Sequence, residues 1–419
     1  MQTKLLNKQY ILIMLVNACS WMSYYIVTTI LTSYMEFLSI ALSIAGVAGG
    51  IFAFTSMFTR PVTGIVTDSF NRKWIFAGCI TLMFASLFLY TVHPTAAFIL
   101  IFRGLQGVAF GFQSTASMAL VAESAPRGRT GEAISYYGII TVAGMALGPI
   151  AAIRISNAFG YPVCMWVGTI FLAAAAGIAY FFPYKSRSVT RMEREEAAAV
   201  LKEAAEQKKR TCVPEAPEQK KNKALSVVRR FIEPGLLDLT MMHFPISMMN
   251  GVISAFLVIF GQSRGLMDIS LYFTVNAVLV IVLRILFAKK VDKLSIAQSY
   301  VPSFIAAAAA LILIAFSDKL WMLVLSAAQR SVTQVLENTT AQTTMLKSVA
   351  PERQGAATCT YYIGGDGGQA IGPMIGGLIV SAAGYSTMWI VFAVIIAADM
   401  VWFLFSKWRK LAPGETYHF

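Results

Sequence analysis

The sequence contains few charged residues for its length. Asp, Glu, Lys and Arg make up only 13% of its 419 residues, whereas a typical soluble domain contains about 25%. Hydrophobic residues make up 57% of the chain, and the mean hydropathy is +0.64. This composition excludes an ordinary soluble domain and predicts a chain whose main solvent is lipid.

Cysteine and histidine are also scarce, with five and three residues respectively. No CxxC pair is present, which argues against a zinc site and a disulfide framework. The sequence has no Gly-rich phosphate loop and no HExxH motif. A membrane enzyme or a non-transporting sensor would need such a constellation or a soluble domain, so we expect no enzyme activity, no cofactor and no metal. The cysteines are Cys19, Cys79, Cys164, Cys212 and Cys359.

Acidic residues are fewer than basic ones, and the net charge is +13. The basic residues concentrate in short connections between apolar runs, as the positive-inside rule predicts for membrane proteins. We therefore reject a nucleic-acid partner and expect a lipid bilayer instead. The charge distribution places both termini in the cytoplasm, which predicts a multi-pass protein of the cell membrane (plasma or bacterial inner) with an even number of spans.

The apolar runs predict an all-α polytopic membrane protein with about twelve transmembrane helices, since one span needs about 20 apolar residues. Residues 185–233 are different, because Arg191–Arg210 is rich in Glu, Lys, Arg and Ala and predicts a polar helix on the cytoplasmic face. This linker divides the chain into six-helix halves at 1–184 and 234–419. The predicted spans are 10–33, 42–66, 74–93, 95–122, 131–157, 161–184, 234–262, 268–290, 297–316, 319–346, 353–383 and 385–407.

The two halves repeat each other in sequence. Arg60, Gly64 and Asp68 recur as Arg284, Ala288 and Asp292, an offset of 284 − 60 = 224 residues. Two other features share this offset, which indicates an internal duplication. They are Gly144, Gly148 and Pro149, which recur as Gly368, Gly372 and Pro373, and Arg129 and Gly131, which recur as Arg353 and Gly355.

The connection between the second and third spans has a distinctive pattern. Gly64 permits close helix contact because it lacks a Cβ, and Asp68 precedes Arg72 by four residues, the favourable order for a helical ion pair. A positive-inside loop is the simpler alternative. The stretch resembles the signature loop of the major facilitator superfamily, and the resemblance extends over essentially the whole chain. It implies two parallel halves with a substrate site near the midplane between them, and a cytoplasmic lock formed by Gly64, Asp68, Arg72 and Glu123.

Two further motifs carry the resemblance. Arg103 with Gln106 and Gly107 resembles the superfamily's fourth-helix motif, whose arginine is associated with proton transfer; a purely structural arginine is the alternative. Gly144, Gly148 and Pro149 resemble a fifth-helix motif that marks exporting antiporters, and Gly372 and Pro373 repeat it. The first copy departs from the family pattern at Ala151 and Ala152, and simple close packing would account for the same glycines.

Ionisable residues inside spans are costly, so each is a functional hypothesis. Glu337 shares one helical face with Arg330 and Gln334, and Asp366 lies among glycines near the middle of the eleventh span. We predict Glu337 and Asp366 equally as proton carriers, with Arg103 and Arg330 adjusting their proton affinity. Asp399 ranks last, in a mainly structural role. The predicted cavity residues are Asn17, Tyr24, Gln113, His243, Asn250, Gln334 and Asn338.

These features predict a proton-coupled antiporter that exports small organic molecules or drugs by alternating access, and that works as a monomer. A proton symporter or uniporter importing a small, anionic metabolite is the alternative, since Arg103, Arg330 and several amides suit an anion. The sequence leaves open the substrate, the direction, the coupling ion and the role of the linker.

Overall fold

The structure, a computed structural model, describes residues 7–69, 71–124, 130–181, 233–266, 268–287, 295–349 and 354–405. The predicted linker lies outside these residues except for Glu233, and so do Arg129 and Arg353 of the repeat. The described residues form helices, with no β-strand among them. The first half contains α1 (Lys8–Phe37), α2 (Leu42–Ser69), α3 (Arg72–Val92), α4 (Ala96–Ser124), α5 (Thr130–Phe159) and α6 (Tyr161–Phe181).

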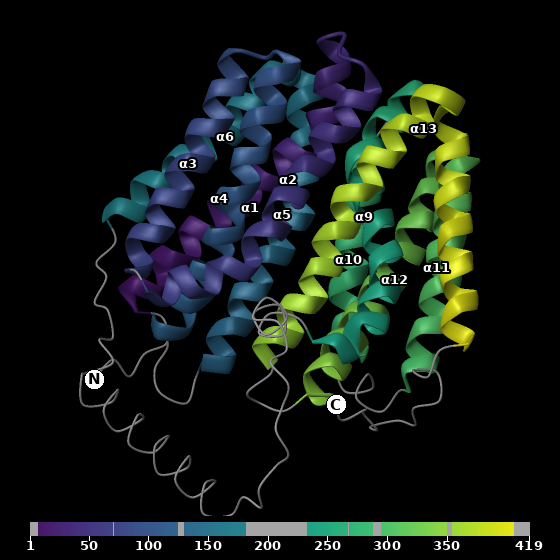
Figure 1. The fold of residues 1–419 in the computed structure, drawn as a ribbon. Coiled ribbons are helices and arrows are strands. Elements are labelled where there is room, and N and C mark those ends of the chain that lie inside the picture. Colours follow the sequence, from purple (N-terminus) through teal and green to yellow (C-terminus); the bar gives the residue numbers. More distant parts are fainter. Residues whose placement is uncertain are drawn as a thin grey trace, which may run out of the picture.

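The second half follows the same plan (Figure 1). A 3-10 turn, η1 (Pro234–Leu236), leads into the first long helix of this half. The last helix, α13, bends at Gly384, where φ is 81° and ψ is 173°. Gly384 therefore separates two spans, at the boundary that the sequence predicts. The long helices are α9 (Leu237–Ser263), α10 (Ser270–Phe287), α11 (Ile296–Ala315), α12 (Leu320–Lys347) and α13 (Gln354–Phe405).

Local sequence signals define several helix starts. The Asn7 side chain accepts a hydrogen bond from the Tyr10 amide at 2.8 Å and caps α1. Asn71 caps α3 in the same way. Ser295 and Gln298 form a reciprocal capping box at the start of α11.

Ten stretches of the described residues are long and apolar enough to cross a membrane. Cys359–Phe405 counts as one stretch of 47 residues although it contains the bend at Gly384. The polar helix α12 is not among the ten. Together these two facts account for the predicted twelve segments. Large apolar side chains face outward with no protein cover, such as Ile285 at 72% exposure and Ile101 at 65%, as expected for a surface that meets lipid.

The start of α1 and the end of α13 lie at the same end of the molecule, which we call the base; the opposite end is the top (Figure 1). Each half has its own hydrophobic core. One continuous cluster fills the second half, centred on α9 and α11. Two clusters fill the first half. The halves are therefore separately packed bodies that meet along seams.

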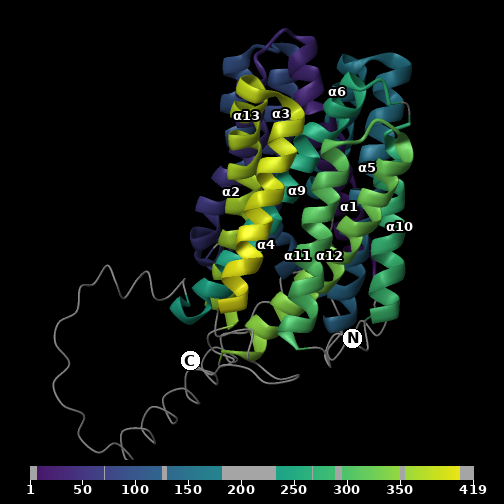
Figure 2. The same cartoon turned by 90° about the vertical axis from the view of Figure 1, so that its right-hand side faces the viewer.

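The halves meet mainly where α2 packs against α13, and also where α5 packs against α10 and α1 against α9 (Figure 2). Where α2 packs against α13, Gly50 approaches the Ala370 carbonyl so closely that no Cβ would fit. At the top, the Tyr161 hydroxyl of α6 also donates a hydrogen bond to Gln262 of α9 at 3.0 Å. The Gly50 contact joins the halves along α2 and α13, and the Tyr161–Gln262 bond joins them at the top.

Candidate functional site

A cavity of about 330 Å³ lies between the two halves. Side chains of α1, α2, α4 and α5 line one wall, and side chains of α9, α10, α12 and α13 line the other. Among the lining residues are five of those that the sequence assigns to the cavity: Tyr24, His243, Asn250, Gln334 and Asn338.

The wall from the first half is mainly aromatic. The rings of Trp21 and Tyr25 stack with centroids 5.8 Å apart. Those of Tyr24 and Phe110 stack at 5.5 Å, and Phe52 lies 5.1 Å from each of them. Aromatic surfaces of this kind bind flat or apolar groups, and the tyrosine hydroxyls add polar contacts.

The wall from the second half holds a buried histidine hydrogen-bonded to a glutamate. His243 Nδ1 lies 2.7 Å from Glu337 Oε1, and His243 Nε2 lies 3.0 Å from the Ser247 hydroxyl. The Tyr361 ring stacks on the imidazole at 4.3 Å. Glu337 is fully buried, and its Oε2 has no hydrogen-bond partner in the described part of the chain. An imidazole and a carboxylate in direct contact can share a proton, and the imidazole lines the cavity wall.

Arg330 and two amides lie on the same wall. Arg330 Nε donates to Asn250 Oδ1 at 3.1 Å, and Gln334 Nε2 donates to the same oxygen at 3.4 Å. Asn276 Nδ2 donates to the Gln334 carbonyl oxygen at 3.4 Å. The row of amides therefore orients Arg330 toward the cavity.

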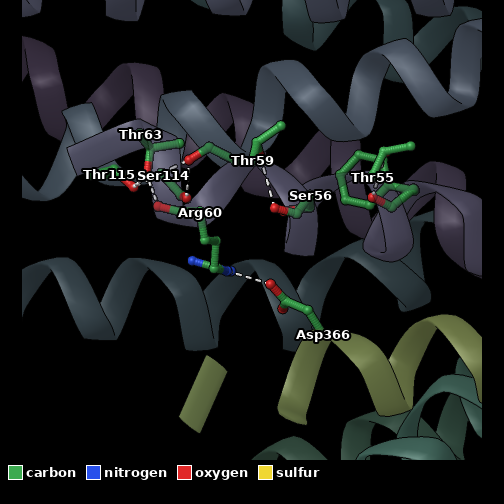
Figure 3. Close-up of polar contacts among 10 residues, drawn as sticks. Thr55, Ser56, Thr59, Arg60, Thr63, Ser114, Thr115 and Asp366 are labelled. Carbon is green, nitrogen blue, oxygen red and sulfur yellow. Dashed lines mark hydrogen bonds and ion pairs between the residues drawn. The ribbon is translucent and has the colours of Figure 1, made fainter. Parts of the chain in front are cut away.

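An ion pair connects the halves. Arg60 of α2 donates from Nε to Asp366 Oδ2 of α13, and the two side chains are 16% and 15% exposed (Figure 3). The guanidinium also lies 4.6 Å above the Tyr362 ring. In Figure 3, hydroxyl side chains continue along α2 beside Arg60, and Thr63 Oγ1 lies 3.1 Å from Thr115 Oγ1 of α4. Asp366 thus bonds across a seam that must change if the halves rock.

Arg103 is placed differently from the sequence prediction. It is 1% exposed, donates at 2.9 Å to both Gln106 and Thr28, and lies 4.6 Å over the Phe52 ring. Its hydrogen bonds are to neutral groups of its own half. Among the described residues, Glu337 bonds His243 and Asp366 bonds Arg60, so the role of Arg103 and Arg330 in adjusting the proton affinity of these acids stays a prediction.

Asn17 and Gln113 are also placed differently. Asn17 is 0% exposed and Gln113 is 2% exposed. The Asn17 Oδ1 accepts from Gln113 Nε2 at 3.2 Å and from Ser117 at 2.6 Å. Neither lines the cavity, because their polar groups satisfy one another within the first half. The prediction that they line it is wrong in this structure.

The predicted lock is described in part. Arg72 at the start of α3 donates to Glu123 near the end of α4. The surroundings of Gly64 and the side chain of Asp68 lie outside the described part of the structure. The locking role stays a prediction.

The glycines of the fifth-helix motif contact the cavity helices. A Cβ on Gly144 would lie 2.9 Å from Trp21 Cβ, and one on Gly148 would overlap Tyr25 Cβ. The repeated copy packs α13 on α9, where a Cβ on Gly372 would lie 2.6 Å from the Met248 carbonyl. Pro149 and Pro373 line the cavity itself. The motif thus sets how closely the helices pack within each cavity wall.

The sequence analysis missed the partner of one cation and ranked one buried acid last. Arg60 was recognised only as part of a repeat, although its position inside a span was the available signal. Asp399 is 7% exposed, its Oδ2 has no hydrogen-bond partner among the described residues, and it interacts electrostatically with Glu337. No three His, Cys, Asp or Glu side chains of the described chain come together as metal ligands.

Comparison with known proteins agrees with this architecture. The family model described as Major Facilitator Superfamily matches residues 13–358 and 239–416. The MFS-type transporter YhjO of Bacillus subtilis is 26% identical over 346 residues, covering 82% of this chain and 79% of that protein. The multi-drug resistance efflux pump PmrA of Streptococcus pneumoniae is 30% identical over 138 residues, covering 32% of this chain and 34% of PmrA. The crystal structure of the peptide transporter POT superposes with a TM-score of 0.73 at 13% identity, covering 94% of this chain and 93% of POT.

The family model covers almost the entire chain, and the relatives are transporters, not enzymes. The helical halves and the cavity between them fit that assignment. The chain therefore belongs to the major facilitator superfamily and is a multi-pass membrane transporter of small molecules.

Proposed function

We propose that this transporter is a proton-coupled antiporter that exports small organic molecules, and that the His243–Glu337 pair carries the proton. The proposal rests on the position of that pair. The imidazole lines the cavity, and the carboxylate bonded to it at 2.7 Å is fully buried. A buried carboxylate is costly unless it is paired or protonated, so the proton affinity of the pair changes when the water content of the cavity changes.

Asp366 has a second role in this scheme. Its bond to Arg60 spans the α2–α13 seam, so neutralising either side chain removes one tie between the halves. Glu337 and His243 then hold the proton, while Arg60 and Asp366 link the occupancy of the cavity to the rocking of the halves. Alternating access of this kind is expected from parallel halves with a midplane site.

The exporting direction is supported by the glycine and proline motif of α5 and α13, and by the partial similarity to PmrA, which is named as an efflux pump. Proton symport of an anionic metabolite is the second candidate. Arg330 favours this second candidate, because its hydrogen bond is to the neutral amide of Asn250. Its positive charge could therefore attract an anionic substrate.

Proteoliposomes with an imposed pH gradient test both candidates. We would follow 2-naphthoate, 2-naphthamide and 2-naphthylmethylammonium, three probes that share one aromatic body. Antiport predicts that a transported probe accumulates when the lumen is acidic. Symport predicts accumulation when the outer medium is acidic. Movement that ignores both gradients would overturn proton coupling.

We also propose that both termini and residues 185–233 face the cytoplasm of a plasma or bacterial inner membrane, and that the monomer is the working unit, since one chain builds both cavity walls. A variant that retains Cys212 of the linker as its only cysteine should react with an impermeant thiol reagent only after the cytoplasmic face is opened. Labelling in intact cells would contradict this orientation.

A further inference from the structure

Arg330 is a buried cation at the wall of the central cavity. Its side chain comes from α12, it is 6% exposed, and it lines the cavity. Its one recorded hydrogen bond in the described structure runs from Nε to Asn250 Oδ1. A guanidinium has five N–H donors, so Arg330 has more donors than this bond uses, and it lines the cavity.

The acids near the cavity are already paired. Asp366 bonds Arg60, and Glu337 bonds His243. Within the described chain no acidic side chain forms an ion pair with Arg330. A desolvated cation without a counter-ion is costly, so an anion entering the cavity would supply the charge that the protein does not.

The neighbours of Arg330 favour an oxyanion over a cation or a neutral molecule. Asn250 Oδ1 is an acceptor that Arg330 and Gln334 already occupy. The groups that remain for a ligand are the guanidinium donors, whose planar fork matches a carboxylate. A cationic ligand would meet Arg330 with no free carboxylate on this wall to offset the repulsion.

The opposite wall defines the rest of the ligand. Tyr25 lines the same cavity as Arg330, from the opposite half. Tyr25 stacks on Trp21, and Tyr24 stacks on Phe110. We infer that the substrate is a small organic anion, with its carboxylate or similar oxyanion bound by Arg330 and its flat apolar body against this aromatic wall. The inference rests on the proposed function only in taking this cavity as the substrate site, and it holds for either direction of transport.

The test compares three probes of one shape on the purified full-length transporter in detergent, by isothermal titration calorimetry. The probes are 2-naphthoate, 2-naphthamide and 2-naphthylmethylammonium. We expect 2-naphthoate to bind at least about tenfold more tightly than 2-naphthamide, as hydrogen bonds to a charged group require, and the ammonium probe to bind most weakly. If 2-naphthoate has no advantage over 2-naphthamide, including the case in which none of the probes binds, the inference is overturned.

Variants then assign the preference to one side chain. Arg330→Gln should abolish the advantage of 2-naphthoate, whereas Arg330→Lys should retain part of it. Arg264→Gln is the matched control, since it removes an arginine at the top that pairs with Asp318 and does not line the cavity. An unchanged preference in a folded Arg330→Gln protein would overturn the assignment. If that variant does not fold, the probe series on the unmodified protein and on Arg330→Lys still decides.

This binding experiment needs no pH gradient, so it separates the two proposals. A preference for 2-naphthoate without any gradient-driven movement in proteoliposomes would contradict proton coupling and leave the anion site intact. Gradient-driven movement of 2-naphthamide alone, with no preference for 2-naphthoate in binding, would support proton coupling and contradict the anion site.

Discussion

The two halves share one repeat but carry different chemistry at matching positions. The residue 224 positions before Glu337 is Gln113, and the residue 224 positions before Arg330 is Gln106. The residue 224 positions before Asp366 is Val142. These three ionisable groups of the second half thus correspond to amides or an apolar side chain in the first.

The consequence is visible in the contacts of Gln113 and Glu337. Gln113 bonds Asn17 inside the first half, away from the cavity. Glu337 bonds His243, which lines the cavity. The first half is therefore a closed network with an aromatic wall, and the second half is where a proton or a charged substrate changes the balance. One duplicated backbone supports both, because membrane helices tolerate charge only where a partner or water meets it.

Glu337→Gln should have the largest effect on transport, because it places in the second half the amide that Gln113 supplies at the matching position of the first half. Gradient-driven transport should fall to background, since the pair can no longer change its proton content, while substrate binding and energy-independent exchange should persist. Transport in proteoliposomes with and without a pH gradient measures both.

Asp318→Asn serves as the control for that experiment, because it removes an acid that is 73% exposed and pairs with Arg264. Full gradient-driven transport by Glu337→Gln would show that this pair is not the proton carrier and would direct attention to Asp366.

Asp366→Asn sharpens the comparison at the seam between the halves. It leaves Arg60 without its counter-ion and should lower stability by about 3 kcal/mol, the lower end for a broken buried pair, because both side chains are partly exposed. Arg60→Gln combined with Asp366→Asn should recover part of this loss. Thermal unfolding of the unmodified protein, of Asp366→Asn, of Arg60→Gln and of the double variant gives the coupling energy. Strictly additive losses would show that the pair is not coupled.

Sequence reasoning predicted the fold well because lipid imposes long apolar runs and the duplication repeats them. The break at Gly384 and the second-half cavity residues His243, Asn250 and Gln334 followed from hydropathy and helical periodicity. Partner choice did not follow. Asp366 could have met Arg103, Arg330 or Arg60, and only the packing of α2 against α13 selects Arg60. Asn17 and Gln113 looked like cavity residues because sequence cannot show that they bond each other.

Gly148→Ala examines the wall of the first half. The added Cβ would overlap Tyr25 Cβ, and displacing α1 should cost about 1–3 kcal/mol, as overpacking usually does. Gly138→Ala is the matched control, because nothing lies within 4 Å of its Cβ position. Melting temperatures of the two variants in detergent should differ clearly. Equal melting temperatures would show that α1 adapts and that the motif does not fix the wall.

The smallest change in stability should come from Glu123→Gln, which removes the acid bonded to Arg72 at the base. The side chains of this pair are 26% and 20% exposed, more than those of Arg60 and Asp366, so the loss should be about 1 kcal/mol at most, as for ion pairs that solvent reaches. Melting should therefore stay nearly constant. Turnover should still fall if the pair belongs to the lock, because weakening the state closed toward the cytoplasm slows every cycle regardless of what the cavity holds. Asp68→Asn should lower turnover in the same way, through the other acid of the predicted lock. Neither variant should change the preference for an anionic probe, which belongs to the cavity wall of the second half. Normal turnover in both variants would show that this connection is only structural.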